Sequence, residues 1–154
     1  MIALLQRVSH AEVVIAGKQF AAIGRGLLVL IGVERHDTER EGERLLERVL
    51  EYRVFPDDQG RMNLSVRDVN GDLLLVPQFT LAADTQKGTR PSFSPAAAPE
   101  EGRRLFENFV ARARASHSPL GTGAFGADMQ LSLTNDGPVT FWLRVRPAAH
   151  AARL

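Results

Sequence analysis

Short apolar runs broken by turn residues predict that the first part of the chain is built from strands. Residues 2–8 and 12–15 are rich in aliphatic and β-branched side chains, and Gly17-Lys18 is a turn signal before a further run over residues 19–23. Leu27 to Val33 is apolar throughout, which is typical of a strand buried on both faces. We therefore expect a hairpin followed by a central strand.

Two helices are predicted from apolar side chains at helical spacing. The first begins at a capping box over Thr38–Glu41 and ends near Arg53, just before a turn cluster. The second begins at Pro99, which is followed by two acidic residues, and ends near Ala115. The apolar stripes are Leu45, Leu46, Val49 and Leu50 in the first helix and Leu105, Phe106, Phe109 and Val110 in the second.

A third apolar run, Leu73 to Val76, is interrupted at Pro77. Gln78 and Thr80 follow, two positions apart, so on an extended segment both side chains point to the same face. Polar groups on a buried strand cost free energy unless they are hydrogen-bonded or face a cavity. The pattern leaves two interpretations open: an edge strand with satisfied polar groups, or a ligand site. The irregular segment Asp84–Pro99 follows, and loops of this length are often functional.

A Gly137-Pro138 pair separates two further strand-like runs, residues 129–133 and 139–145. Proline has no backbone N–H and a fixed φ, so it does not belong inside a central strand. Glycine tolerates backbone angles that other residues avoid, and the X–Pro bond is where a cis peptide is common. We expect a turn here. It is either a plain tight turn or a rigid backbone probe that touches a ligand.

Composition narrows the class of protein. A length of 154 residues with 44% hydrophobic residues suits one domain with a real core. No cysteine is present, and no apolar run reaches the roughly 18 residues that span a bilayer. The start of the chain is charged too early for a signal peptide. We therefore expect a cytoplasmic protein without a membrane partner, a metal or a cofactor. The histidines lack metal-ligand spacing; they are His10, His36, His117 and His150.

Charge and local motifs exclude several functions. The net charge of +1 argues against a strongly basic nucleic-acid binder, and we expect no DNA partner, although a protein that touches only the end of an RNA needs no large basic patch. Gly121 to Gly126 fits G-x-G-x-x-G, but it follows a helix and precedes a strand, unlike a dinucleotide fingerprint. No G-x-S-x-G elbow supports a serine hydrolase.

Six stretches together resemble the D-aminoacyl-tRNA deacylase family over roughly residues 1 to 145. They are Met1–Val8, Gly26–Val33, Met62–Leu64, Gln78–Thr85, Arg90–Ser94 and Asn135–Phe141. The resemblance implies an α+β fold, rich in strands, in which antiparallel sheets form a barrel-like core closed by two main helices. It implies a homodimer that hydrolyses the ester between a D-amino acid and the 3′ adenosine of tRNA. It also implies removal of glycine mischarged on alanine tRNA, so that the protein proofreads translation.

The resemblance also assigns residues to the site. It implies that Gln78, Phe79 and Thr80 form the catalytic segment around the ester, next to Pro77. It further implies that Gly137-Pro138, typically a cis peptide in the family, enters the site of the other subunit and binds substrate there. Backbone carbonyls of such a turn can accept hydrogen bonds from the substrate α-ammonium, and its bulk rejects L-substrates by a clash, which a glycyl substrate escapes.

The catalytic groups that the resemblance implies are weak ones. Backbone N–H groups near Phe79 and Thr80 would stabilise the oxyanion. An aminoacyl ester is already activated, so the ribose 2′-OH can assist water without a histidine or cysteine. Thr80 lacks an obvious base neighbour, which favours a positioning role over a nucleophilic one.

One departure from the family pattern keeps two alternatives open. The family usually has serine before the glutamine, whereas this chain has Pro77, as does a related group of deacylases that tolerates L-amino acids. The first alternative is therefore a relaxed deacylase of mischarged L-aminoacyl- or glycyl-tRNA. The second is a non-catalytic RNA-binding homodimer. In each case we expect one domain over residues 1–146 and a frayed tail over 147–154.

Overall fold

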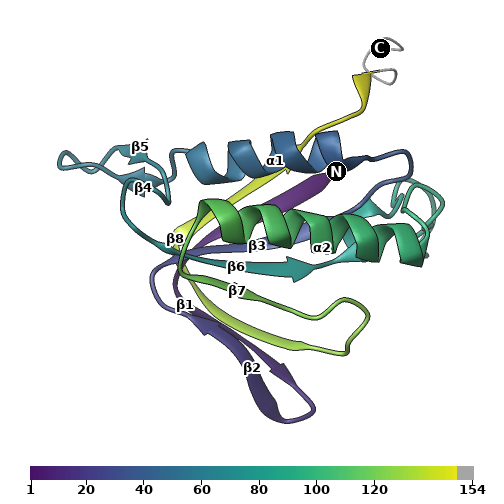
Figure 1. Cartoon of the computed structure of the whole chain (residues 1–154), viewed down its shortest axis with the longest axis horizontal. Helices are drawn as coiled ribbons and strands as arrows, with labels where there is room; N and C mark the ends of the chain where they lie inside the picture. Colours follow the sequence, from purple (N-terminus) through teal and green to yellow (C-terminus); the bar gives the residue numbers. More distant parts are fainter. Residues whose placement is uncertain (149–154) are drawn as a thin grey trace.

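The computed structural model describes residues 1–148, in which eight strands, two α-helices and one 3₁₀ turn follow one another (Figure 1). From residue 149 on, the predicted tail lies outside the described residues. The elements are β1 (Ile2–Ile15), β2 (Lys18–Ile23), β3 (Gly26–Gly32), α1 (Glu39–Glu51), β4 (Phe55–Pro56), β5 (Met62–Leu64), β6 (Asp72–Pro77), the 3₁₀ turn η1 (Phe79–Ala82), α2 (Pro99–Ser116), β7 (Leu120–Thr122) and β8 (Gln130–Arg144).

The predicted hairpin is present, with its turn one residue earlier than expected. β1 continues to Ile15, and the turn is Ala16-Gly17, where φ is 51° and 75°. Two consecutive positive φ values suit the right-handed twist of a tight hairpin. Glycine adopts such an angle without strain, which explains why the chain turns beside Gly17.

One mixed sheet carries the fold. Its strand order is β2-β1-β3-β6-β7, and β8 pairs with β1. β1 is antiparallel to β2, β3 and β8, whereas β3–β6 and β6–β7 are parallel. The expected strand-rich α+β class is confirmed, but the expected all-antiparallel pairing is not. The reason is that α1 and α2 lie on the connections between these strands, and a helical crossover returns the chain to the same end of the sheet.

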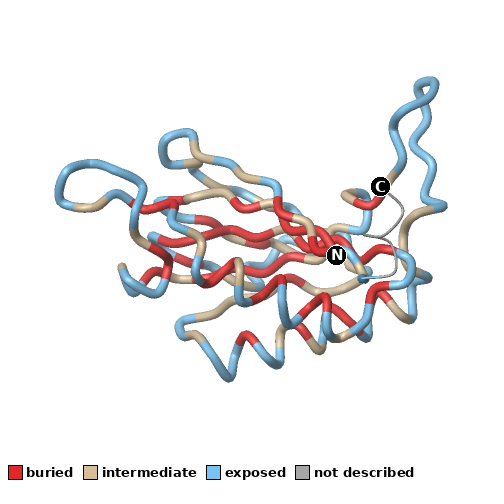
Figure 2. The backbone as a smooth tube through the Cα atoms, turned by 90° about the horizontal axis from the view of Figure 1, so that it is seen from above, coloured by how far each residue is buried: buried red, intermediate tan, exposed pale blue. Residues whose placement is uncertain are grey.

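The sheet curls until its two ends approach each other, which gives the barrel-like shape. A Cβ on Gly121 of β7 would lie 3.4 Å from the Cβ of Ala21 in β2. Inside the curl is an apolar cluster that includes Val8, Val13 and Leu74. These side chains alternate along their strands with those that face the helices, so the central strands are buried on both faces, as predicted. Figure 2 shows buried segments concentrated in the middle of the sheet, with exposed loops at its ends.

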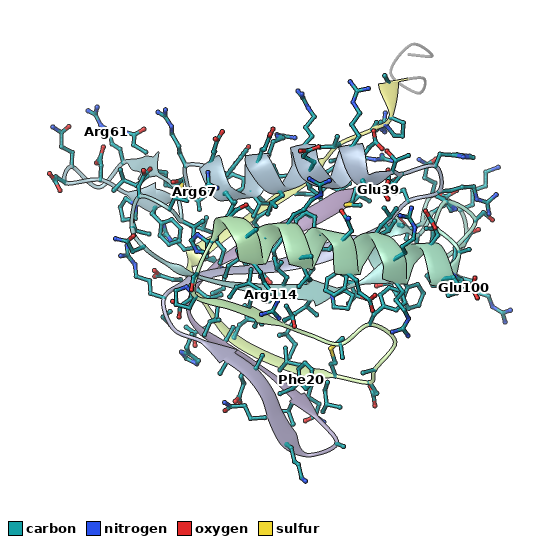
Figure 3. The ribbon with its side chains drawn as sticks, in the orientation of Figure 1. Phe20, Glu39, Arg61, Arg67, Glu100 and Arg114 are labelled. Carbon is teal, nitrogen blue, oxygen red and sulfur yellow. The ribbon has the colours of Figure 1, made fainter. Side chains whose placement is uncertain are left out.

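The two helices cover the other face of the sheet and run in the same direction. Figure 3 shows Glu39 and Glu100, in the first turns of α1 and α2, at the same end of the molecule. Ion pairs Arg104–Glu39 and Arg112–Glu43 join the two helices. The capping box at Thr38 is confirmed, and α1 ends two residues before the predicted Arg53.

The apolar stripes of both helices face the larger core. In α1 all four predicted stripe residues are buried, whereas in α2 Val110 is half-buried and Ala113 is buried in addition. Among the described residues, neither helix has the length and apolar character that crossing a membrane requires.

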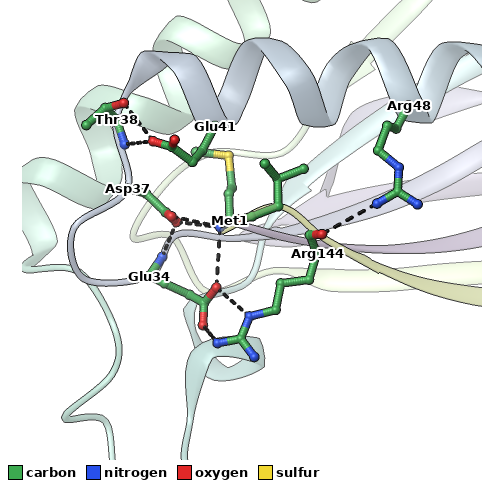
Figure 4. A network of polar contacts seen from close by, with 8 residues as sticks. Met1, Glu34, Asp37, Thr38, Glu41, Arg48 and Arg144 are labelled. Atoms are coloured by element: carbon green, nitrogen blue, oxygen red, sulfur yellow. Dashed lines mark hydrogen bonds and ion pairs between the residues drawn. The ribbon is translucent and has the colours of Figure 1, made fainter. Parts of the chain in front are cut away.

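The α-ammonium of Met1 is buried and joins the start of β1 to the end of β8 (Figure 4). It donates to Asp37 Oδ1 at 2.8 Å, to Glu34 Oε2 at 3.3 Å and to the Val145 carbonyl at 2.7 Å. Glu34 also pairs with Arg144 of β8. Burial raises the pKa of Asp37 above its ordinary value, and the ammonium opposes that rise. The network therefore ties the start of β1 and the end of β8 to the loop that precedes α1.

We predict that Asp37→Asn destabilises the protein by about 3 kcal/mol, because it leaves a buried ammonium with one carboxylate partner fewer. The free energy of unfolding in urea measures this loss. Asp58→Asn, at an exposed turn between β4 and β5, is the matched control and should change stability by less than about 0.5 kcal/mol. Equal effects of the two substitutions would refute a stabilising role for the network.

We predict that Gly32→Ala costs about 1–3 kcal/mol, because β3 and η1 pack too closely for a side chain. A Cβ at Gly32 would lie 2.9 Å from the Leu81 Cβ and 3.2 Å from the Gln78 carbonyl oxygen. Gly42→Ala in α1 is the control, since its Cβ would meet Met1 Cε at an ordinary 3.6 Å and helix propensity favours alanine by about 1 kcal/mol. Thermal denaturation should show a lowered Tm for Gly32→Ala and not for Gly42→Ala.

Candidate functional site

The segment predicted from Gln78 and Thr80 lies where β6 ends and the chain turns. Pro77 is the last strand residue, and Gln78 N donates to the Ile31 carbonyl at 2.7 Å. From Phe79 the backbone forms η1, so the two polar side chains are not on an extended segment as expected. They still meet, because Thr80 Oγ1 donates to Gln78 Oε1 at 2.7 Å. A 3₁₀ turn, and not the edge strand that was one of the two interpretations left open, brings them together.

The first backbone N–H groups of a helical turn have no hydrogen-bond acceptor within the turn, and in η1 these belong to Phe79 and Thr80. The bonds of this turn begin with Leu81 N to the Gln78 carbonyl at 3.3 Å and continue with Ala83 N to the Thr80 carbonyl at 3.1 Å. The N–H groups of Phe79 and Thr80 precede them and are available to a ligand. Both residues are exposed.

The long irregular segment that we predicted to be functional lies beside η1. The Phe79 ring, which is 57% exposed, stacks at a tilt on Phe93 with 5.2 Å between centroids. The segment is held by a bridge between Asp84 and Ser92 and by Arg35 N, which donates to the Pro95 carbonyl at 2.8 Å. Two exposed aromatic rings in contact mark this end of the molecule as a surface for a flat or apolar ligand.

Two cavities flank Phe79 and share the walls Pro77, Phe79, Phe125 and Gly126. The first, of about 240 Å³, is lined mainly by apolar groups from β3 and α2; these are Ile31, Val33, Ala97, Pro99, Gly102 and Phe106. The second, of about 310 Å³, is more polar and runs along Gln78 towards Val76, Ala127, Asp128, Met129 and Leu131. Together they form a cleft that Gln78 and Phe79 line, and Thr80 follows them in the same turn.

The far wall of this cleft was not predicted from the sequence. Phe125 belongs to the glycine-rich stretch that we rejected as a dinucleotide motif, and it carries Arg103 over its ring at 5.1 Å. Gly123 brings this wall close, because a Cβ there would lie 2.9 Å from Met129 Sδ and 3.3 Å from Pro77 Cδ. The glycines of this stretch were the available signal, since closely spaced glycines often mark a close backbone approach.

The Gly137-Pro138 pair lies within one strand, not at a turn between two strands as we predicted. β8 runs from Gln130 to Arg144, and its pairing with β1 is interrupted by a bulge. Asn135 faces Val8 and Thr140 faces Gln6, so four residues of β8, Asp136–Val139, stand opposite Arg7 alone. The chain thus keeps both halves of the strand in the sheet and projects the bulge from it.

The bulge needs glycine and contains a cis peptide between Gly137 and Pro138. Gly137 has φ of 140°, which side chains rarely allow, and a Cβ there would lie 2.6 Å from Val139 Cγ2. Both members of the pair are exposed.

Arg7 fastens the bulge, and the sequence analysis did not single it out. Its Nε donates to the Asp136 carbonyl at 3.0 Å, and its Nη1 donates to the Val54 carbonyl at 2.6 Å. The Asp136 carboxylate lies 3.7 Å from Arg7 Nε, and the arginine side chain is only 13% exposed. A charged residue inside the apolar run 2–8 was the available signal, since buried charges are paired.

Within one chain, the turn and the bulge lie at opposite ends of the sheet. Pro77 pairs with Ile31, whereas Arg7, opposite the bulge, pairs with Leu27 of the same strand, β3. Four residues along β3 correspond to about 13 Å, and the three strand intervals from β8 through β1 and β3 to β6 add about 14 Å across the sheet. The two predicted parts of the site are therefore about 19 Å apart and do not meet in one protomer.

The residues predicted for the site carry uncharged side chains, whereas the second cavity beside them is also lined by Asp128. Gln78, Phe79, Thr80, Gly137 and Pro138 carry no ionisable group. Within residues 1–148, no group of three or more His, Asp or Glu side chains could hold a metal ion. The backbone N–H groups of the turn, its amide and hydroxyl side chains and the apolar cavity beside it can hydrogen-bond and enclose a ligand.

The chain matches the family model for D-Tyr-tRNA(Tyr) deacylase over residues 4–144. It is 63% identical to the D-aminoacyl-tRNA deacylase of Cupriavidus metallidurans, over 98% of this chain and 100% of that protein. It is 62% identical to the D-aminoacyl-tRNA deacylase of Nitrosococcus oceani, over 99% of this chain and 98% of that protein.

Two solved structures share the fold. The c-Myc DNA Unwinding Element Binding Protein superposes with a TM-score of 0.91 at 39% identity, over 96% of this chain and 100% of that one. A probable eukaryotic D-amino acid tRNA deacylase superposes with a TM-score of 0.75 at 19% identity, over 94% of this chain and 98% of that one, which shows likeness of fold alone. Given the family match and the two close relatives, this chain belongs to the D-Tyr-tRNA(Tyr) deacylase family.

Proposed function

We propose that this protein hydrolyses the ester between a D-amino acid and the 3′-terminal adenosine of tRNA in the cytoplasm, and that it also releases glycine mischarged on alanine tRNA. The observation that carries the proposal is the pair of incomplete half-sites in one chain. One is an exposed turn beside an apolar cleft, and the other is a fastened bulge about 19 Å away. The turn supplies N–H groups and a cleft for the ester, and the bulge supplies carbonyls for the ammonium and a steric block.

The proposal includes a homodimer in which each subunit completes the other's site. A two-fold axis gives each chain the partner's bulge at its own turn, because such an interface repeats every contact twice. The face between the two half-sites suits this role, since Trp142 on β8 is 53% exposed there and Leu81 of η1 is only half-buried. Large exposed aromatic groups are typical of interface centres.

In this assembly the cleft receives the 3′ end of the tRNA. The apolar cavity next to Phe79 and Phe125 suits a nucleobase, which binds between aromatic and aliphatic groups. A base placed there leaves the ribose and its ester at the rim, near Gln78 and Thr80. Lys87 and Arg90, exposed on the neighbouring loop, are our candidates for contacts to the acceptor stem. Arg61 and Arg67 project from the opposite end of the molecule and are less suited to this role (Figure 3).

Selection between mirror-image substrates follows from the partner's bulge. Its backbone carbonyls accept hydrogen bonds from the substrate α-ammonium, and once the ammonium and the ester carbon are fixed, chirality alone decides where the side chain points. A rigid Gly137-Pro138 obstructs the direction that an L-side chain takes. Glycine has no side chain to obstruct, so it passes.

The hydrolytic step requires from the protein no nucleophilic side chain, only groups that position the ester and stabilise the oxyanion. Water adds to the ester carbonyl carbon, the N–H groups of Phe79 and Thr80 stabilise the oxyanion, and the ribose oxygen leaves with a proton. The 2′-OH of the same ribose assists the attacking water. The Thr80 hydroxyl donates to the Gln78 amide oxygen, which is not a base, so Thr80 positions the turn and does not attack.

Pro77 supports a second candidate, a deacylase that tolerates L-amino acids. Pro77 lines both cavities and stands where the family commonly has serine. A more apolar wall beside the ester accommodates side chains less selectively. The two candidates differ in substrate range and share the reaction.

We predict that purified protein releases D-tyrosine and glycine from tRNA and leaves L-tyrosyl-tRNA at its spontaneous rate. The experiment is a side-by-side deacylation assay with the three substrates at equal concentration. The same assay with a chelator present should give the same rates. Release of L-tyrosine at a comparable rate would favour the relaxed deacylase, and no release from any substrate would refute the proposed reaction.

We predict that two inactive variants restore activity when their chains are mixed. Gly137→Val distorts the bulge, and Thr80→Arg fills the cleft of the chain that carries it. Heterodimers formed by refolding the two together contain one intact site, so an equal mixture should recover about a quarter of wild-type activity by random pairing. Each variant refolded alone is the control. A mixture as inactive as its components would show that the two half-sites do not combine across subunits.

A further inference from the structure

Asn135 stands at the neck of the bulge, where β8 leaves β1. It is the last residue before the bulge with a partner in β1, and Thr140 is the first residue after it. Its side chain is half-buried, whereas Asp136, Gly137 and Pro138 are exposed. The residue is therefore placed to set how the bulge departs from the sheet.

The amide of Asn135 makes contacts on both sides of the neck. Its Nδ2 donates to the Arg7 carbonyl at 2.9 Å and to the Val139 carbonyl at 2.9 Å. Both carbonyls belong to residues whose strand pairing the bulge interrupts. An amide nitrogen carries two hydrogens, so these two bonds use its full donor capacity. The side chain thus replaces missing strand pairing and closes the bulge at its base.

The two carbonyls fix which way round the amide lies, because they can only accept, so the amide nitrogen must face them. A third contact completes the arrangement: the Thr140 hydroxyl donates to Asn135 Oδ1 at 3.4 Å and accepts from Gln6 Nε2 at 3.4 Å. An aspartate of the same shape presents only oxygens to those carbonyls and repels them.

The bulge is therefore held at two places by different chemistry. Arg7 holds the Asp136 carbonyl by a charged group, while Asn135 holds the two strands at the neck by a neutral one. Arg7 contacts the bulge at Asp136, through its carbonyl and its carboxylate, whereas Asn135 joins the two strands where they part. The neck therefore sets the angle at which the remaining residues leave the sheet.

We propose that Asn135 is a positioning residue for chiral selection: its amide fixes the direction in which Gly137 and Pro138 project into the partner's cleft. The inference rests on the proposed function. Without the amide, the bulge carbonyls are no longer aligned with the substrate ammonium. Gly137 and Pro138 then no longer block the position that an L-side chain occupies. Asn135 itself touches no substrate.

Asn135→Asp tests this proposal through selectivity, which a general loss of folded protein would not alter. The variant and wild type are assayed with D-tyrosyl-, L-tyrosyl- and glycyl-tRNA. We expect kcat/KM for D-tyrosyl- and glycyl-tRNA to fall by about tenfold, the effect of a partly buried acceptor losing its donor. Release of L-tyrosine should rise above the spontaneous rate, so the D-to-L ratio falls by more than tenfold.

Asn108→Asp is the matched control, because the same change there leaves the Arg112 Nε bond to its side-chain oxygen in place. It should leave all three rates unchanged. Thr140→Val is the second variant and removes only the hydroxyl that donates to the amide oxygen of Asn135. It should lower the D-to-L ratio by about two- to fivefold, the effect of one weak hydrogen bond. This variant decides the question if Asn135→Asp does not fold.

The outcomes separate the two proposals. An active, selective wild type whose Asn135→Asp and Thr140→Val variants keep the same D-to-L ratio would overturn the positioning role alone. A uniform fall of all three rates would overturn it as well, since that indicates fewer working sites and not an altered direction. A wild type without turnover on any substrate would overturn the proposed function and this inference with it.

Discussion

The pairing of β1 with β8 is the constraint on which most of the structure depends. β1 is paired along both edges, with β3 and β2 on one side and β8 on the other. Through these pairs it contributes side chains to both apolar cores and places its first residue against the end of β8. The pairing shifts register twice, at Ser9 and opposite Arg7, and the larger interruption, opposite Arg7, is the bulge. The fold tolerates it because the paired segments of β1 and β8 before and after it hold the strands in place.

The same constraint explains why polar side chains take over where backbone pairing stops. Arg7 and Asn135 serve backbone carbonyls around the bulge, and Thr38 and Glu41 serve backbone groups at the start of α1. In the described residues, no buried side-chain nitrogen or oxygen lacks a partner. Side-chain hydrogen bonds thus support the irregular segments at the bulge and at the start of α1, where backbone pairing is interrupted.

Much of the architecture follows from local sequence patterns. The uninterrupted run Leu27 to Val33 and the stripe of α1 predicted buried elements, and Thr38 with Glu41 predicted the start of a helix. Such signals depend on neighbours a few residues away and survive in the folded chain. The parallel pairing of β3 with β6 could not be predicted in this way, because strand partners are set by the whole chain.

The candidate site was predictable only in part, for the same physical reason. Gln78 and Thr80 stood out as polar residues after an apolar run, but their 3₁₀ conformation depends on close packing against Gly32, a distant residue. Gly137-Pro138 stood out as well, yet the continuity of β8 through the pair depends on Arg7 and Asn135. Phe125 was overlooked because nothing nearby shows that it faces Phe79 across a cavity.

The separation of the two half-sites has a consequence for the living cell. An enzyme whose sites each need two chains gains activity with the square of chain concentration when chains are scarce, and in proportion to concentration once dimers form. At low expression, the activity of such an enzyme would therefore fall more steeply than the concentration of its chains. The dissociation constant of the dimer would set the abundance at which activity appears. A sheet with its turn at one end and its bulge at the other would create this dependence on dimer formation.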